Sequence, residues 1–395
     1  MKQRMMVLIV LVAALAMIAA FSSPAMARVR GVCSECHTMH SSQSPSPQDW
    51  LNNGWVPGQT PNVALLAAST GCLGCHQAAA GVQNDGSNNI PYVHQTNDPN
   101  YGLTGTTGDT TAGGTFYYMK LNEGTQAGDA KAHNVDGIST SEDSVLGFDP
   151  PGYDATLGQS LGLPASWSGQ RLTCAGTYGC HGDHNELDQF AAISGGHHGD
   201  DTPPLDGSTI PKSYRFLKGI IGLEWNTSGT TGGRWEYKPT AGAHNQYKGV
   251  DRTDDTYTSG SDDTISFLCA ECHGFFHSSD NAANTAQGGI DDGITWGNWV
   301  RHPTDYDMGN TAQGSEYRSY GATYDVDAPV ASETIGLTPV STVTFSDDTI
   351  VACISCHRAH GTDYADLLRW EYNMDSGSGV DNGGCFICHT EKDDA

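Results

Sequence analysis

The chain has 395 residues, with 45 acidic and 19 basic side chains and a formal net charge of −26. This charge argues against nucleic acid as a partner, because binding a phosphate backbone requires a basic surface. Hydrophobic residues make up 37% of the sequence and glycine occurs 49 times, so the chain is poorly supplied with core side chains for its length.

The N-terminal segment has the features of an export signal. A positively charged start is followed by an apolar run over residues 5–21 and by a small-residue cleavage site at 25–27. A retained membrane anchor is the alternative, but the run is short for a bilayer span. We predict a secretory signal peptide at residues 1–27 and a single domain at residues 28–395 without a membrane span. The mature protein is then expected outside the cytoplasm, passing through the periplasm to the cell surface or the extracellular space.

Short periodic segments occur along the rest of the chain, and none of them is long. Tracts rich in Gly, Ser, Thr and Asp separate these segments and predict loops. The predicted fold class is therefore mostly irregular backbone with a few short helices and short strands. In chain order, the patterns predict a strand at Thr115–Leu121, a helix at Glu186–Ile193, strands at Ser213–Leu217 and Arg234–Lys238, a helix at Ile265–His277, a strand at Val340–Phe345 and a helix at Asp363–Met374.

All 12 cysteines occur in pairs, and a histidine directly follows the second cysteine of each pair. Five pairs have the spacing C-x-x-C-H, in which two thiols add to the vinyl groups of a haem and the histidine binds its iron. We call each set a cassette and number the cassettes from one to six along the chain. They predict six covalently attached c-type haems, whose porphyrins would supply the core that the side chains do not. The cassettes are Cys33/Cys36/His37, Cys72/Cys75/His76, Cys174/Cys180/His181, Cys269/Cys272/His273, Cys353/Cys356/His357 and Cys385/Cys388/His389.

The third cassette differs from the others, because five residues lie between Cys174 and Cys180. A disulfide is the alternative for this pair, since disulfides form in an oxidising compartment. Haem attachment is favoured because His181 follows directly and His184 lies three residues further on, a spacing that also occurs after the first and fifth cassettes. Zinc is a second alternative for pairs of this kind, but six separate pairs that each have their own histidine do not suit a zinc site.

Histidine is also the predicted second ligand of each iron. Six of the 16 histidines belong to the cassettes, and the remaining ten outnumber the methionines that follow the signal peptide. A low-spin electron-transfer haem needs a strong ligand on its second face, so we predict two histidines on every iron. A histidine just after a cassette cannot reach the far face of its own haem and is expected to bind a neighbouring one. The predicted distal ligands are His40, His94, His133, His184, His302 and His360, with His277, His244, His197 and His198 in reserve.

Four segments together resemble a known family. They are Cys33-Ser-Glu-Cys36-His37-Thr-Met-His40, Lys131-Ala-His133-Asn, Val300-Arg-His302-Pro and Cys353-Ile-Ser-Cys356-His357-Arg-Ala-His360. Their order resembles that in the hexahaem extracellular cytochromes that polymerise into conductive filaments, the OmcS-like cytochrome nanowires. The resemblance covers the order of the motifs and not the loops between them. It implies a fold of mostly coil around a continuous stack of haems, each bound by two histidines, and export of electrons to minerals, electrodes or other cells. It also implies that His40 binds a haem of the neighbouring subunit.

Three functions are compatible with six haems. In a filament, head-to-tail contact would bring haem six of one subunit to haem one of the next and would remain open-ended, with outer-membrane cytochromes or external electron acceptors as further partners. The alternatives are a monomeric electron shuttle of the periplasm or outer surface, and a multihaem oxidoreductase. An enzyme needs an open coordination position, which six complete cassettes and many spare histidines disfavour. We therefore predict electron conduction without catalysis.

Overall fold

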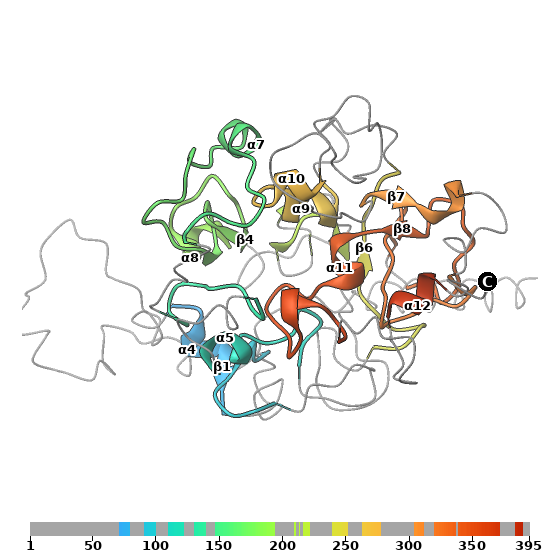
Figure 1. The fold of residues 1–395 in the computed structure, drawn as a ribbon, viewed down its shortest axis with the longest axis horizontal. Coiled ribbons are helices and arrows are strands. Elements are labelled where there is room, and N and C mark those ends of the chain that lie inside the picture. Colours follow the sequence, from blue (N-terminus) through green and yellow to red (C-terminus); the bar gives the residue numbers. More distant parts are fainter. Residues whose placement is uncertain are drawn as a thin grey trace, which may run out of the picture.

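The computed structural model describes residues 71–79, 91–99, 110–121, 130–139, 147–193, 209–210, 213, 216–221, 239–251, 263–277, 304–311, 320–336, 339–371 and 384–389. These residues form short helices and strands of two or three residues, joined by irregular backbone (Figure 1). The predicted fold class, mostly coil with a few short elements, is thereby confirmed. The signal peptide, the first cassette and the predicted strand at Arg234–Lys238 lie outside the described residues.

Two parallel strand pairs hold the second and third cassettes. α4 (Leu73–His76) completes the second cassette and leads into β1 (Gln77–Ala78), which pairs with β2 (His94–Gln95). β3 (Thr173–Ala175) and β4 (Gly179–His181) pair within the third cassette itself. In both places a very short pairing positions a cysteine and histidine set.

The predicted strand at Thr115–Leu121 is wrong, because this segment forms the helix α5 (Tyr117–Leu121). The Thr115 hydroxyl accepts the N–H of Tyr117 at 3.1 Å and also hydrogen-bonds the side chain of Gln95. A threonine in this position satisfies a backbone donor at the start of a helix. Of the residues that suggested a strand, Thr115 therefore caps the helix, and Phe116 and Tyr118 are buried.

Aspartates begin the two helices on either side of the third cassette. Asp154 accepts backbone N–H groups at the start of α7 (Ala155–Ser160), and Asp188 accepts the N–H of Phe190 at the start of α8 (Gln189–Ala192). The helix predicted at Glu186–Ile193 is thus present but shorter, because Asp188 occupies the capping position.

The helix predicted at Ile265–His277 is confirmed at both ends and interrupted between them. α9 (Ile265–Ala270) begins where the Thr264 hydroxyl accepts the N–H of Phe267 at 3.0 Å, and α10 (Gly274–His277) follows after a break. The break contains Cys272 and His273, so the fourth cassette itself separates the two helices.

The remaining described elements lie in the C-terminal half. Antiparallel pairing joins β5 with β6 and β7 with β8, and the fifth and sixth cassettes each form a helical turn. The elements are β5 (Ile220–Ile221), β6 (Gln246–Tyr247), β7 (Tyr306–Asp307), the 3₁₀ turn η3 (Met308–Asn310), β8 (Ile350–Val351), α11 (Cys353–Cys356), the 3₁₀ turn η5 (Ala365–Leu367) and α12 (Cys385–Cys388).

The helix predicted at Asp363–Met374 is wrong over its described part. Only η5 forms there, and Asp366 and Leu367 both have positive φ values, which end any helix. Backbone hydrogen bonds from Arg358 to Leu367 and from Arg369 to Cys356 tie the segment to the fifth cassette. This pairing with the cassette replaces the hydrogen bonds that a helix would have formed.

Two predicted strands are also wrong where the structure describes them. In Val340–Phe345, Thr342 makes a single isolated bridge with Thr323, and Phe345 has a φ of 60°. The described residues of Ser213–Leu217 belong to no strand, and the nearest pairing begins at β5. Both segments contain the residue types of strands, but their described residues do not form the continuous pairing that a strand requires.

Three small apolar clusters take the place of a single core in the described residues. The first includes Ile354 of the fifth cassette, and the second packs against cysteines of the fifth and sixth cassettes. The third includes Leu73 of the second cassette and packs against Cys174 of the third. Every cluster therefore borders a cassette. Within the described ranges, no helix combines the length and apolar character needed to cross a membrane.

Candidate haem-binding cavity

A cavity of about 650 Å³ lies where the second, third, fourth and fifth cassettes meet. The cassettes reach it from α4, the β3–β4 pair, the α9–α10 segment and α11, which follow one another across the molecule in Figure 1. Its walls combine apolar side chains with the thiols and imidazoles that c-type haem attachment requires. The cassette side chains that line it are Cys72, His76, Cys174, Cys180, His181, Cys269, Cys272, His273 and His357.

Hydrogen bonds fix the ring orientation of three cassette histidines. The Nδ1 atoms of His76, His273 and His357 lie 2.8, 2.7 and 2.7 Å from the backbone carbonyl oxygens of residues 91, 151 and 366. A carbonyl can only accept, so Nδ1 donates its proton and the lone pair of the neutral ring lies on Nε2. Metal-binding histidines are held in this way, and the three rings are therefore ready to bind iron through Nε2.

Two of the predicted distal ligands face cassette histidines across the cavity. The ring centres of His133 and His273 are 6.0 Å apart, and those of His360 and His181 are 6.4 Å apart. Two imidazoles that bind one metal from opposite sides, each with a nitrogen about 2 Å from it, have ring centres about 6 Å apart. Both ring separations therefore match the distance expected for two histidines that bind one iron.

Burial keeps these histidines in the form that binds metal. Removal from water, together with the repulsion of neighbouring imidazoles, lowers the pKa of His273 to about 4 and that of His360 to about 3. Burial also lowers the pKa of His133, although its Nδ1 donates to the carbonyl oxygen of Ala359 at 2.5 Å. All three are neutral at pH 7, and the neutral imidazole is the ligating form.

The third cassette presents both of its thiols to the cavity in spite of its longer spacing. The register of β3 and β4 places Cys174 and Cys180 at neighbouring positions on the two strands, and both side chains line the cavity. The connecting turn depends on glycine: Gly176 has a φ of 84°, and a Cβ at Gly179 would lie 2.5 Å from the backbone nitrogen of Ala175. The five residues between the two cysteines therefore form a tight turn.

The second, third and fourth cassettes are in contact in sequence order. Cys174 of the third packs against the apolar cluster that contains Leu73 of the second. His184, just after the third cassette, has its Nδ1 2.7 Å from Oε2 of Glu271, which lies inside the fourth. These three cassettes therefore lie close together in space, although many residues separate them in the sequence.

The same order continues to the sixth cassette. The Ser266 hydroxyl in α9 accepts the N–H of Cys353 in α11 at 3.3 Å, which joins the fourth cassette to the fifth. Cys356 of the fifth and the two cysteines of the sixth pack against one apolar cluster that contains Trp370. The attachment points of cassettes two to six therefore form a continuous series.

The sixth cassette differs from the other described cassettes, because its histidine does not line the cavity. His389, predicted to bind the sixth iron, is absent from the cavity wall that the histidines of cassettes two to five share. It ends α12, where its backbone N–H donates to the carbonyl oxygen of Cys385 at 3.0 Å, and its side chain is half-buried. In Figure 1, α12 lies on the far side of α11 from α4. A sixth haem therefore needs a space of its own, and the role of His389 as its ligand stays a prediction.

The other predicted distal ligands are not among the residues that line this cavity. His94 is buried, and its Nδ1 lies 2.9 Å from Oε1 of Gln77, next to the second cassette. The pKa of His184 is raised by Glu271 in spite of the opposing effect of burial. His277 ends α10. The remaining candidates His40, His302, His197 and His198 lie outside the described residues.

His244, a reserve candidate, uses both ring nitrogens in contacts with the protein. Nδ1 lies 2.7 Å from the carbonyl oxygen of Asn245, and Nε2 lies 3.3 Å from that of Val340. The ring also stacks on Tyr324, with centres 3.6 Å apart and planes 6° apart. These contacts are those of a structural histidine.

Arginines in the cavity wall are the group that the sequence analysis missed. Arg171, Arg358 and Arg369 all line the cavity. The chain has only 19 basic residues against 45 acidic ones, and this rarity was the signal that could have singled the arginines out. Arg358 also directly follows His357, so the sequence alone places it beside the fifth cassette.

Comparisons with known proteins agree with the interpretation of the motifs. The family model described as a doubled CXXCH motif matches residues 348–394, which contain the fifth and sixth cassettes. The chain is 26% identical over 405 residues to the C-type cytochrome OmcS of Geobacter sulfurreducens, covering 91% of this chain and 83% of that protein. The resemblance seen in the sequence motifs is thereby confirmed.

Two solved structures are also similar to the chain. The outer membrane cytochrome S filament from Geobacter sulfurreducens is 18% identical with a TM-score of 0.40, covering 88% of this chain and 85% of that one. The cryo-EM structure of the OmcS nanowires from the same organism is 20% identical with a TM-score of 0.35, covering 86% and 83%.

Proposed function

We propose that this chain is a multihaem c-type cytochrome that holds six covalently attached haems in a row and conducts electrons along it. The continuous series of contacts between the second and the sixth cassette is the observation that carries the proposal. When bound, each haem supplies a one-electron iron couple. The chain attaches the haems, encloses them and sets their order, and the order in space follows the order in the sequence.

The histidines have two roles in this proposal. Each cassette histidine binds the iron of its own haem, and His133 and His360 complete the coordination at the fourth and third cassettes, as the ring distances of 6.0 and 6.4 Å support. His40, His94, His184 and His302 are proposed for the remaining irons. Coordination by two histidines leaves no position for a substrate, so the role is electron transfer and not catalysis.

We further propose that the protein is exported and forms head-to-tail filaments. The relative named C-type cytochrome OmcS supports this, because its solved structures are described as filaments and nanowires. In this arrangement residues 1–27 are removed on export, residues 28–395 form one subunit, and His40 binds a haem of the next subunit. Electrons would pass along the filament to acceptors outside the cell or to outer-membrane cytochromes.

Intact mass and absorption spectra of the purified native protein test the haem count. We expect a mass increase of six haems over the chain that lacks residues 1–27, and a low-spin spectrum. A Cys174→Ser, Cys180→Ser double variant should carry one haem fewer. If that variant keeps the full count, the third cassette is not an attachment site. A native protein without added porphyrin would disprove the function as a whole.

A further inference from the structure

The wall of the haem-binding cavity has the opposite charge balance from the chain as a whole. The sequence contains 45 acidic and 19 basic side chains. The described residues that line the cavity include the three arginines Arg171, Arg358 and Arg369 but only one acid, Asp149. The Asp149 carboxylate already accepts the N–H of Trp167. Such a wall suits a ligand that is mainly apolar and carries negative charge.

Arg369 is the most buried of these cations, with 4% of its surface exposed. Its backbone N–H donates to the carbonyl of Cys356 at 2.8 Å, and its Nε donates to the carbonyl of Ile354 at 2.7 Å. These two bonds hold the guanidinium against α11 in the fifth cassette. Its two terminal nitrogens make no hydrogen bond to any described residue, and the side chain faces the cavity.

No described carboxylate forms an ion pair with Arg369. Asp327 interacts with Arg369 electrostatically without forming an ion pair. Burial raises the pKa of the Asp327 carboxyl, and the nearby Asp325 raises it further. Arg358 and Arg369 lower that pKa, but the net shift is upward. A guanidinium that is removed from water without an anionic partner is strongly destabilising. The cavity ligand is therefore expected to bring the missing negative charge.

We propose that Arg369 binds a propionate carboxylate of a haem held in this cavity. The propionates are the anionic groups of an otherwise apolar porphyrin, and a guanidinium with two unused terminal nitrogens can bind a carboxylate through two parallel hydrogen bonds. This inference rests on the proposed haem attachment and adds to it a positioning residue that iron ligation does not require. A cation in this place also raises the reduction potential of the haem, because it favours the ferrous form, which has the lower positive charge.

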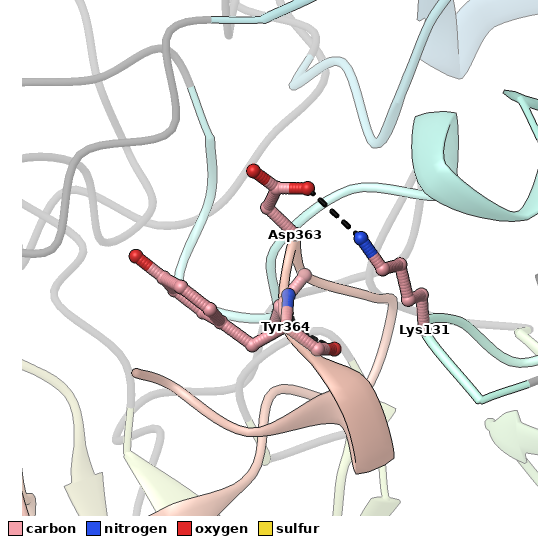
Figure 2. A network of polar contacts seen from close by, with 4 residues as sticks. Lys131, Asp363 and Tyr364 are labelled. Carbon is pink, nitrogen blue, oxygen red and sulfur yellow. Dashed lines mark hydrogen bonds and ion pairs between the residues drawn. The ribbon is translucent and has the colours of Figure 1, made fainter. Parts of the chain in front are cut away.

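The test compares variants of the full, haem-loaded protein by spectroelectrochemical titration. In Arg369→Gln we expect one haem component to shift to lower potential, by at least a tenfold change in its ferric-to-ferrous ratio, which is about 59 mV for one electron. Arg369→Lys keeps the charge and should recover most of the shift. Lys131→Gln is the control, because Lys131 pairs with Asp363 at 3.1 Å where solvent screens both charges (Figure 2).

Intact mass of each variant separates this proposal from the proposed function, since it counts haems independently of potential. Unchanged potentials in Arg369→Gln at full haem content would overturn the propionate contact, and so would equal shifts in the Gln and Lys variants. If Arg369→Gln does not mature, a cryo-EM map of the haem-loaded wild-type protein decides. A propionate oxygen within hydrogen-bond distance of the Arg369 terminal nitrogens is the expected result, and terminal nitrogens bonded only to protein or water would contradict it.

Discussion

His133 makes two contacts that suit its proposed role as a metal ligand. Its Nδ1 donates to the carbonyl of Ala359 at 2.5 Å, and its ring faces His273 at 6.0 Å. The first contact leaves the lone pair on Nε2, and the second gives a ring separation that suits one iron between two histidines. His244 differs in both respects, because each of its nitrogens already lies close to a carbonyl.

Replacing these two histidines should therefore have different effects. In His133→Ala we expect one haem to become high-spin while the number of attached haems stays the same, because the thioether bonds and His273 are unaffected. His244→Asn is the matched control and should leave all haems low-spin. Electron paramagnetic resonance of the oxidised proteins measures the change. A fully low-spin His133→Ala protein would remove this residue from the set of ligands.

Buried imidazoles also predict how stability depends on pH. The folded chain holds His273 and His360 at pKa values of about 4 and about 3, below the ordinary 6.5. The unfolded chain binds protons below pH 6.5 that these folded sites cannot bind, so stability is full above that pH and falls as the pH decreases towards 4. Each imidazole contributes a slope of up to about 1.4 kcal/mol per pH unit. Denaturant titrations at pH 7 and pH 5 measure the effect, and equal stability at the two values would contradict it.

At the scale of elements, three irregular segments meet at Gly361 and position the distal histidines. Gly361 has a φ of 150°, and a Cβ added to it would lie 2.5 Å from Ala132 Cβ and 2.6 Å from the carbonyl oxygen of Thr115. His360 directly precedes Gly361 in the sequence, and His133 directly follows Ala132. Close backbone approach, which only glycine permits, thus holds both histidines in the cavity wall.

The substitution Gly361→Ala tests this arrangement. We expect it to lower the free energy of unfolding by about 1–3 kcal/mol, because the new methyl group overlaps backbone atoms of two other segments. Gly336→Ala is the control, since no atom lies within 4 Å of a Cβ added there. Thermal unfolding of the haem-loaded proteins gives the comparison. Similar stability of the two variants would show that the three segments can separate without cost.

Sequence patterns predicted the elements that depend on local capping and missed those that depend on distant partners. The helix after Thr264 was predictable because the cap and the apolar residues are adjacent in sequence. The segment after Asp363 was not, because its backbone bonds to the fifth cassette instead of to itself. The ligand types were readable from the cassettes, whereas the pairing of His360 with His181 joins residues far apart in the chain and has no local signal. The position of His389 outside the shared cavity had no signal either, because its motif is locally like those of the cassettes that line it.

At the scale of the whole molecule, the cassettes define the architecture more than the secondary structure does. The described apolar clusters are small and each borders a cassette. The cavity of about 650 Å³ lies between four of the cassettes. In the proposed filament, the sixth cassette of one subunit contacts the first cassette of the next, so the series of cassettes extends from subunit to subunit.

His40 provides the test of that assembly. His40→Ala should give monomers without filaments in negative-stain images, because it removes a ligand proposed to cross the subunit interface, while each monomer keeps its haems through its own cysteines. Met39→Leu is the control in the same motif and should still polymerise. Filaments of normal length in the His40→Ala protein would show that another contact holds the subunits together. If the wild-type protein itself forms only monomers, the electron shuttle becomes the better interpretation.

The pairing of His181 with His360 has a consequence for biogenesis. A chain that crosses a membrane from its N-terminus delivers the third cassette well before the residue that faces it. A porphyrin already fixed at that cassette would spend the interval with one side of its iron exposed to oxygen, peroxide or any stray small ligand. In the proposed export route, the second face of that iron would be protected only after the last tenth of the polypeptide, which contains His360, had crossed the membrane.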